Sequence, residues 1–125
     1  MASSVKEMMA AANAAVQPLL DDPALGRLWL IDVEGEAVGY IALCFGYSIE
    51  FAGRDAFVDE FFIDAAHRGR GLGRAVLERL VAAASAFNVR ALHLEVARDN
   101  ARAARLYGAA GFESRAKYHL MTRYL

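Results

Sequence analysis

A turn rich in arginine and glycine is the part of this sequence whose residue types point most directly to chemistry. The stretch HRGRGLGRAVL, residues 67–77, holds three glycines within five positions, three arginines and no acidic residue. Glycine accepts positive φ, so backbone N–H groups around Gly69, Gly71 and Gly73 can point into one concavity. A helix that starts here adds unpaired N–H groups and the positive end of its dipole. The turn therefore predicts an anion site, most often a phosphate site.

Three arginines add positive charge that backbone amides cannot supply, namely Arg68, Arg70 and Arg74. A tight glycine turn with solvated arginines is the plain alternative. The nucleotide P-loop is excluded because the turn lacks the lysine and hydroxyl of G-x-x-x-x-G-K-[ST]. The dinucleotide pattern G-x-G-x-x-G fits poorly because Val76 stands where its third glycine belongs. Glu95 does stand about where that site has its ribose-binding acid.

A second motif follows the turn in the order strand, asparagine, helix ending in LY, and GF. It is LHLEVARDNARAARLYGAAGFE, residues 92–113, and it follows [RQ]-x-x-G-x-[GA], which Arg68, Gly71 and Gly73 satisfy. On both motifs the sequence resembles the GNAT superfamily of acetyl-CoA-dependent N-acetyltransferases over residues 28–125. The resemblance implies an α/β (α+β) domain, acetyl-CoA as co-substrate, an amine as acceptor and no metal.

The resemblance also implies where the cofactor binds. In the family, acetyl-CoA lies where two parallel strands part, here residues 56–63 and 90–96. Free main chain of the first strand binds the pantetheine arm like an added strand, and the turn binds the diphosphate. Core packing explains the side chains at 61–63 as well, and a helix cap explains Asn100. The implied cofactor-binding residues are Phe61, Phe62, Ile63, Arg68, Gly69, Arg70, Gly71, Leu72, Gly73, Arg74, Asn100 and Tyr107.

Catalytic roles follow from the same resemblance. Tyr107 matches the tyrosine that protonates the departing CoA thiolate, which leaves more easily with a proton. The attacking amine must first lose a proton, since an alkylammonium has a pKa of about 10. Glu60 and Glu95 each match a position of the base in some family members. Core packing for the tyrosine and solvation for the glutamates are the plain alternatives. Strand alternation puts Asp59 and Glu60 on opposite faces, so at most one faces the reaction centre.

Acidic residues gather before the glycine turn and bear on the acceptor. If several line a cleft, they favour a small cationic amine such as a polyamine, an aminoglycoside or a lysine side chain. Surface solvation is the other interpretation. Two further functions stay open: a protein N-terminal or lysine acetyltransferase, and an acetyl-CoA-binding regulatory or interaction module without turnover. The acids are Glu50, Asp55, Asp59 and Glu60.

Composition predicts a packed soluble domain. Of 125 residues, 57% are hydrophobic and 23% charged, which excludes a disordered chain. Fourteen basic against fifteen acidic residues argue against a nucleic-acid binder. The single cysteine, Cys44, favours a reducing compartment, and the three histidines have no metal-ligand spacing. No apolar run reaches the ~20 residues of a membrane span. We expect a cytoplasmic protein that binds neither membrane nor nucleic acid.

Apolar periodicity and turn residues predict the elements of one mixed-sheet domain over residues 1–125. A capping box at Ser4 opens a helix expected to end near Pro18. A hairpin turning at Glu34-Gly35 follows. The expected elements are strands 27–33 and 36–45, a loop at 46–55, strand 56–64, helix 72–87, strand 90–96, helix 101–110, and final strands 112–117 and 118–125.

The start of the chain departs from the family pattern. Family members usually begin with a strand and two helices, whereas about twenty-six residues with one convincing helix precede the first strand here. The resemblance thus implies a GNAT-like sheet abbreviated at the N-terminus. An exposed sheet edge invites pairing with a second chain. We expect a homodimer, with an acceptor pocket completed across the interface.

Overall fold

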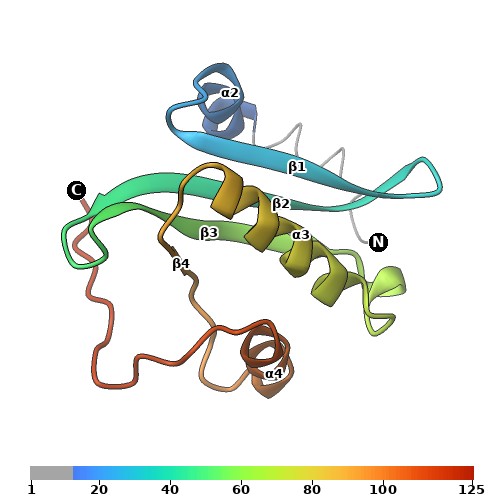
Figure 1. The fold of residues 1–125 in the computed structure, drawn as a ribbon. Helices are drawn as coiled ribbons and strands as arrows, with labels where there is room; N and C mark the ends of the chain where they lie inside the picture. The colour runs from blue at the N-terminus through green and yellow to red at the C-terminus, as the bar shows by residue number, and fades with distance from the viewer. Residues whose placement is uncertain (1–12) are drawn as a thin grey trace. The chain divides into compact units, whose positions relative to one another are not determined.

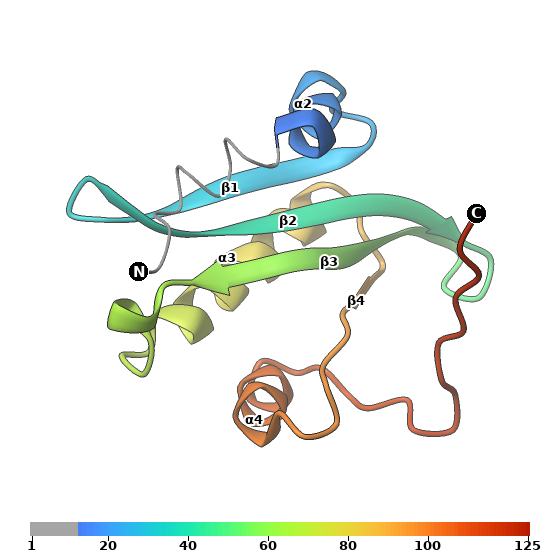
Figure 2. The same ribbon diagram turned by 180° about the vertical axis from the view of Figure 1, so that it is seen from behind.

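The computed structural model describes residues 13–125, which form two compact units that divide after Glu95. The first unit holds helices α2 and α3, a 3-10 turn η1 and four strands (Figures 1 and 2). The second unit, from Val96 to Leu125, holds helix α4. In chain order the elements are α2 (Asn13–Asp21), β1 (Gly26–Val33), β2 (Glu36–Ser48), β3 (Gly53–Ile63), η1 (Ala65–His67), α3 (Leu72–Ala86), β4 (Ala91–His93) and α4 (Ala101–Ala109).

The four strands form one mixed sheet in the order β1-β2-β3-β4. β1 pairs with β2 and β2 with β3 in antiparallel fashion, whereas β3 and β4 are parallel. Helix α3 lies against one face of this sheet (Figures 1 and 2). Its buried Leu77, Leu80 and Ala84 recur at helical spacing and form a core with buried residues of β2 and β3. The predicted mixed α/β sheet is thereby confirmed.

Local signals set the turn of the first hairpin as predicted. Glu34 and Gly35 have φ of 52° and 82°, the positive pair of a two-residue turn that matches strand twist. The expected loop 46–55 is mostly strand, because β2 runs to Ser48 and β3 begins at Gly53. Long antiparallel pairing overrides the turn-like composition there.

Two other expectations are wrong. Helix α2 continues through Pro18 to Asp21, and the Pro18 carbonyl still accepts a helical hydrogen bond from the Asp22 N–H at 3.1 Å, so the proline does not end the helix. The Ser4 capping box lies outside the described residues. Residues 112–125 form no strand, since the second unit offers no strand within its described residues for them to pair with.

Replacing Gly39 by alanine is expected to destabilise the sheet. Gly39 pairs with Ile63, and a Cβ there would lie 2.2 Å from the Phe62 carbonyl oxygen, which is backbone and cannot rotate away. We expect G39A to lower the free energy of unfolding by about 1–3 kcal/mol, measured by urea denaturation. The control is G46A on the same strand, where a Cβ meets only the Asp55 carboxylate. Equal losses in the two variants would contradict this reading of β2.

Candidate cofactor and catalytic site

Strands β3 and β4 part soon after they meet. They pair at three positions, of which Phe57 with His93 is the last. From Val58 to Ile63, β3 keeps its pairing with β2, while no strand among the described residues pairs with its other edge (Figure 2). β4 ends at His93, so the expected strand 90–96 is less than half as long as predicted. Phe61, Phe62 and Ile63 all lie on the stretch of β3 with a free edge.

A β-bulge lies within this stretch. Val58 pairs with Leu43 and Glu60 with Ala42, which leaves Asp59 as an extra residue in β3. Both Asp59 and Glu60 are exposed. Burial raises the pKa of the Cys44 thiol most, and the charges of these two carboxylates raise it further. The strict alternation expected for Asp59 and Glu60 therefore does not hold, and both carboxylates act on the same thiol.

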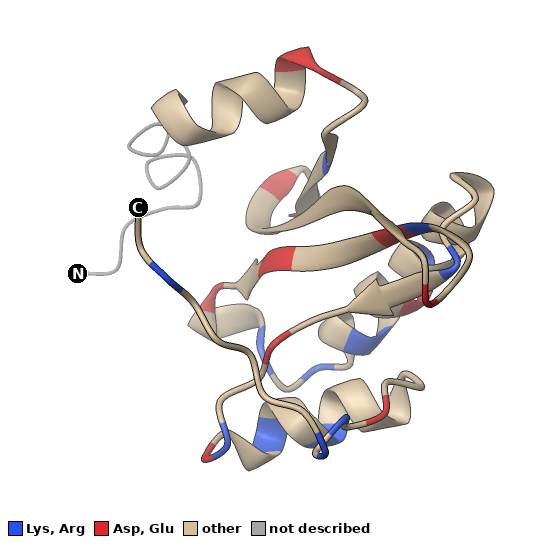
Figure 3. Cartoon of the chain, turned by 90° about the vertical axis from the view of Figure 1, so that its left-hand side faces the viewer, with Lys and Arg blue, Asp and Glu red and all other residues tan. Residues whose placement is uncertain are grey.

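The face of the sheet away from α3 carries a row of polar and aromatic side chains. Tyr40 is buried, and its hydroxyl donates to Oε1 of Glu60 across 3.5 Å. Burial first and the Glu60 charge second raise the pKa of this tyrosine. Figure 3 shows acidic residues along the strands and basic residues on α3 and α4. Register and alternation place these residues on the row: Tyr40, Cys44, Asp55, Phe57, Asp59, Glu60, Phe62 and His93.

The glycine turn is tied to the end of β3. Asp64 caps η1: its carboxylate accepts from the His67 N–H at 3.1 Å and lies 2.6 Å from Nδ1 of His67. Nε of Arg68 donates to the Ile63 carbonyl at 2.7 Å, and the guanidinium lies 5.6 Å from the Phe62 ring centroid. The turn thus begins where the free edge of β3 ends.

Two of the three glycines supply the backbone geometry. Gly69 and Gly71 have φ of 76° and 77°, the left-handed region. Gly71 is the N-cap of α3 without a side-chain cap, and a Cβ there would meet nothing within 4 Å. Gly73 lies inside α3 and has no positive φ, so the expectation that it helps to shape the turn does not hold. The result is an open helix N-terminus with unpaired N–H groups, which is an anion site in form.

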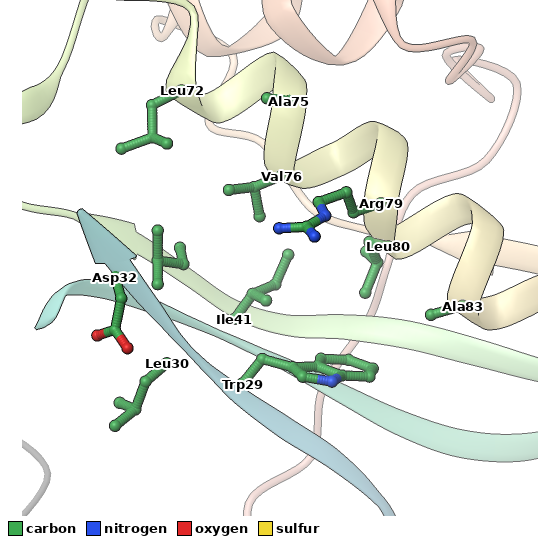
Figure 4. Close-up of a pocket in the computed structure, with 11 residues that line it drawn as sticks. Trp29, Leu30, Asp32, Ile41, Leu72, Ala75, Val76, Arg79, Leu80 and Ala83 are labelled. Atoms are coloured by element: carbon green, nitrogen blue, oxygen red, sulfur yellow. The ribbon is translucent and has the colours of Figure 1, made fainter. Parts of the chain in front are cut away.

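The remaining residues of the turn differ in their exposure and in the groups they contact. Arg70 is exposed, whereas Nε of Arg74 lies 3.3 Å from Oε1 of Glu78 on the outside of α3. Leu72 is half-buried and lines a cavity of about 450 Å³ between α3 and the first two strands (Figure 4). This cavity is bounded mainly by apolar side chains, with Trp29, Ile41 and Val76 among them.

The second unit holds Asn100 and Tyr107. Oδ1 of Asn100 accepts from the Ala103 N–H at 3.1 Å, which confirms the helix-cap interpretation. Tyr107 lies in α4 with its ring 6.1 Å from that of Phe112, and burial raises its pKa. Glu95 is the exposed last residue of the first unit. The structure thus brings Glu60, residues 61–63 and the glycine turn together in one unit, and Asn100 with Tyr107 in the other.

Comparison with known proteins decides the family. The chain matches the sequence model of the Acetyltransferase (GNAT) family over residues 5–112. The chain belongs to the GNAT family. It is 31% identical over 83 residues to the spermine/spermidine N(1)-acetyltransferase of Bacillus subtilis (strain 168). That match covers 64% of this GNAT chain and 55% of the relative, so the chain spans about half the length of the curated relatives it matches.

Two solved structures share the fold of this chain. An integron cassette protein from the mobile metagenome of Cole Harbour Salt Marsh is 40% identical with a TM-score of 0.82, over 93% of this chain and 70% of that one. A putative acetyltransferase from Agrobacterium tumefaciens str. C58 is 24% identical with a TM-score of 0.76, over 90% and 78%. At 24% identity, the second structure is evidence for the fold of this GNAT chain and for nothing further.

One pair of this GNAT chain was not predicted from its sequence. Nε2 of His93 lies 3.1 Å from Oδ2 of Asp55, and the two side chains are 21% and 20% exposed. The rings of Phe51 and Phe57 lie 5.5 and 5.3 Å from the imidazole. The two residues are 38 positions apart in the sequence, and the register between β3 and β4 brings them together. The pair could have been predicted only from the correct pairing of these two strands.

Within residues 13–125, no three histidine, cysteine or acidic side chains stand close enough together to hold a metal ion. None of the helices in this part is long and apolar enough to cross a membrane.

Proposed function

We propose that this chain transfers the acetyl group of acetyl-CoA to an amine by direct attack of the amine on the thioester. The free edge of β3 from Val58 to Ile63, leading into the glycine turn, carries the proposal. The pantetheine arm would bind this edge as an added strand. The diphosphate would bind the N–H groups and arginines between Arg68 and Arg74, with Asn100 as a further contact. Membership of the GNAT family supports this assignment.

Each chemical step has a proposed group. Main-chain N–H groups of residues 61–63 would bind and polarise the thioester carbonyl. Tyr107 would protonate the departing thiolate, and its raised pKa supports this because the phenol then keeps its proton at neutral pH. For the base, the sequence offers Glu60 and Glu95.

A small cationic amine is the acceptor we propose. Asp55, Asp59 and Glu60 line up on one face of the sheet beside the parting strands, where negative charge would attract an ammonium ion. The name of the Bacillus subtilis relative, a spermine/spermidine N(1)-acetyltransferase, supports a polyamine. A lysine side chain or a protein N-terminus is the alternative acceptor, and a module that binds acetyl-CoA without turnover is the alternative function.

Incubation with acetyl-CoA and a panel of amines tests the proposal. The panel holds spermine, spermidine, an aminoglycoside and a lysine-containing peptide, and mass spectrometry reads the acetylated products. We expect acetylation of a polyamine with release of one CoA thiol per product. Tight acetyl-CoA binding without any product would favour the binding module, and a product from the peptide alone would favour a protein acetyltransferase.

We further propose a cytoplasmic homodimer built from one domain per chain. The family match runs across the boundary between the two units, which supports a single domain over residues 1–125. β1 is an edge strand of the sheet that the described residues form, and its Leu30 is 49% exposed. Analytical ultracentrifugation is expected to give the mass of two chains, and L30K to shift it toward one, because a charge on an edge strand opposes pairing. A native monomer would contradict this.

A further inference from the structure

The His93–Asp55 pair stands at the point where β3 and β4 part. Phe57 with His93 is the last paired position of the two strands, and the free edge of β3 begins at the next residue, Val58. The imidazole contacts the rings of Phe51 and Phe57, and its side chain is 21% exposed. A partly buried histidine with a carboxylate partner, at the point where a proposed cofactor cleft closes, is a candidate for a chemical role.

The contact with Asp55 fixes which ring nitrogen is free. An ionised carboxylate only accepts hydrogen bonds, so Nε2 carries the hydrogen and donates it across 3.1 Å. Nδ1 then keeps its lone pair. Nδ1 makes no hydrogen bond within the described part of the chain. In that part, every fully buried side-chain nitrogen or oxygen has a hydrogen-bond partner. Since Nδ1 has none, it is not fully buried and reaches solvent. An imidazole nitrogen with an accessible lone pair can accept a proton from a bound ammonium ion.

The proposed cofactor position brings the reacting carbon toward this nitrogen. The diphosphate would bind beyond Ile63, at the open end of the cleft, so the thioester end of the pantetheine arm would point to the closed end at Phe57. Six residues of β3, from Val58 to Ile63, span about 20 Å. Asp59 and Glu60 lie two and three residues past Phe57, about 7–10 Å along the strand. An ammonium ion bound by these carboxylates is thus within reach of His93.

We propose that His93, and neither glutamate, is the base that deprotonates the acceptor, an inference that rests on the proposed function. An N–H bond of the ammonium ion breaks as an Nδ1–H bond forms, and the Asp55 carboxylate stabilises the resulting imidazolium. The neutral amine attacks the thioester carbon, Tyr107 gives its proton to the CoA sulfur as the C–S bond breaks, and the nitrogen of the intermediate returns a proton to that phenolate. His93 releases its proton to solvent, so the products are the amide, CoA thiol and one proton.

Asp55 acts as a positioning residue in this scheme. Its carboxylate holds the ring in the tautomer with a free Nδ1. The charged and titratable groups on the side of the sheet that His93 occupies are Asp55, Asp59 and Glu60 from β3, and the Cys44 thiol and Tyr40 hydroxyl from β2. The two sequence-derived candidates then have other roles: Glu60 binds the ammonium ion, and Glu95 is an exposed residue beyond β4.

Kinetics of H93Q with spermidine, or with the panel amine that the native chain acetylates fastest, test this inference. We expect kcat to fall about 100-fold, with the Kd of acetyl-CoA and the melting temperature close to those of the native chain. E60Q is expected to raise KM for the amine more than it lowers kcat. The control is H119Q, which removes an exposed histidine of the second unit.

The variant D55N keeps the test decisive if H93Q fails to fold. Without the carboxylate the ring loses the acceptor that fixes its tautomer and orientation, so we expect kcat to fall about 10-fold or more with KM for the amine close to native. A merely structural pair would lower the melting temperature and leave kcat in place. H93Q kinetics within about threefold of native would overturn this inference alone, since general bases contribute about 100-fold or more, as would a native kcat in a folded D55N. Failure of the native chain to acetylate any panel amine would overturn the proposed function, and this inference with it.

Discussion

Replacing Tyr107 by phenylalanine is expected to lower kcat about 100-fold, the usual contribution of a general acid. The variant removes only the hydroxyl, so the ring still packs against Phe112 and acetyl-CoA still binds. Thiolate would then leave without a proton. Because burial raises the pKa of this phenol above its ordinary value, the native chain should stay active well into alkaline pH before the acid is lost. Release of free CoA thiol, followed from pH 6 to pH 10, measures both effects.

The control for this experiment is Y124F. It makes the same chemical change at a tyrosine that is 92% exposed, and native kinetics are expected. A native kcat in Y107F would mean that Tyr107 is only a packing residue of α4. A loss of acetyl-CoA binding equal to the loss of kcat would mean that the hydroxyl binds the cofactor instead of moving a proton.

Elements with local signals were predicted well. The turn at Glu34-Gly35 needs two residues with positive φ, and the sequence shows the glycine. Helix α3 follows an apolar repeat and stops before Asn88, which has φ of 63°. The cap of α4 is a single asparagine that accepts from a nearby N–H. Each of these features depends on residues that are close together in the sequence, which is the range that sequence patterns describe.

Features that depend on pairing between distant residues were not predicted. The bulge at Asp59 is defined only by the pairing of β3 with Leu43 and Ala42 on β2. The sequence-based assumption of strict alternation therefore placed the Asp59 and Glu60 carboxylates on opposite faces, which is wrong. The end of β4 at His93 is set by where β3 leaves it. The apolar residues after position 112 look like strands, yet a strand forms only where another supplies hydrogen bonds.

In the candidate site, too, the local features were predicted and the features that depend on strand pairing were not. The glycine turn was found from its composition, because positive φ and charge are visible in single residues. The Asp55–His93 pair was missed, because neither residue forms a motif with its sequence neighbours. Its role stays a proposal, but its geometry follows from one register, Phe57 opposite His93. Strand pairing, and not residue type, is what the sequence leaves undetermined here.

Replacing Arg68 by alanine is expected to weaken acetyl-CoA binding about 10- to 100-fold, the loss typical of hydrogen bonds to a charged group. Arg68 adds charge beside the helix N-terminus, and its Nε bond to the Ile63 carbonyl ties the turn to the end of β3. The variant therefore loses an anion contact and loosens the turn. Isothermal titration calorimetry with acetyl-CoA measures the change.

A shorter ligand separates this effect from a general loss of structure. S-acetylpantetheine lacks the diphosphate, so we expect R68A to bind it as the native chain does. R68K should bind acetyl-CoA with intermediate affinity, because lysine keeps the charge but cannot reproduce the planar donor group. The matched control, R79A, removes an arginine from the later part of α3, beside the cavity and away from the turn. Native affinity for acetyl-CoA in R68A would contradict diphosphate binding at this turn, whereas equal losses for both ligands would mean that Arg68 only holds β3 and the turn in shape.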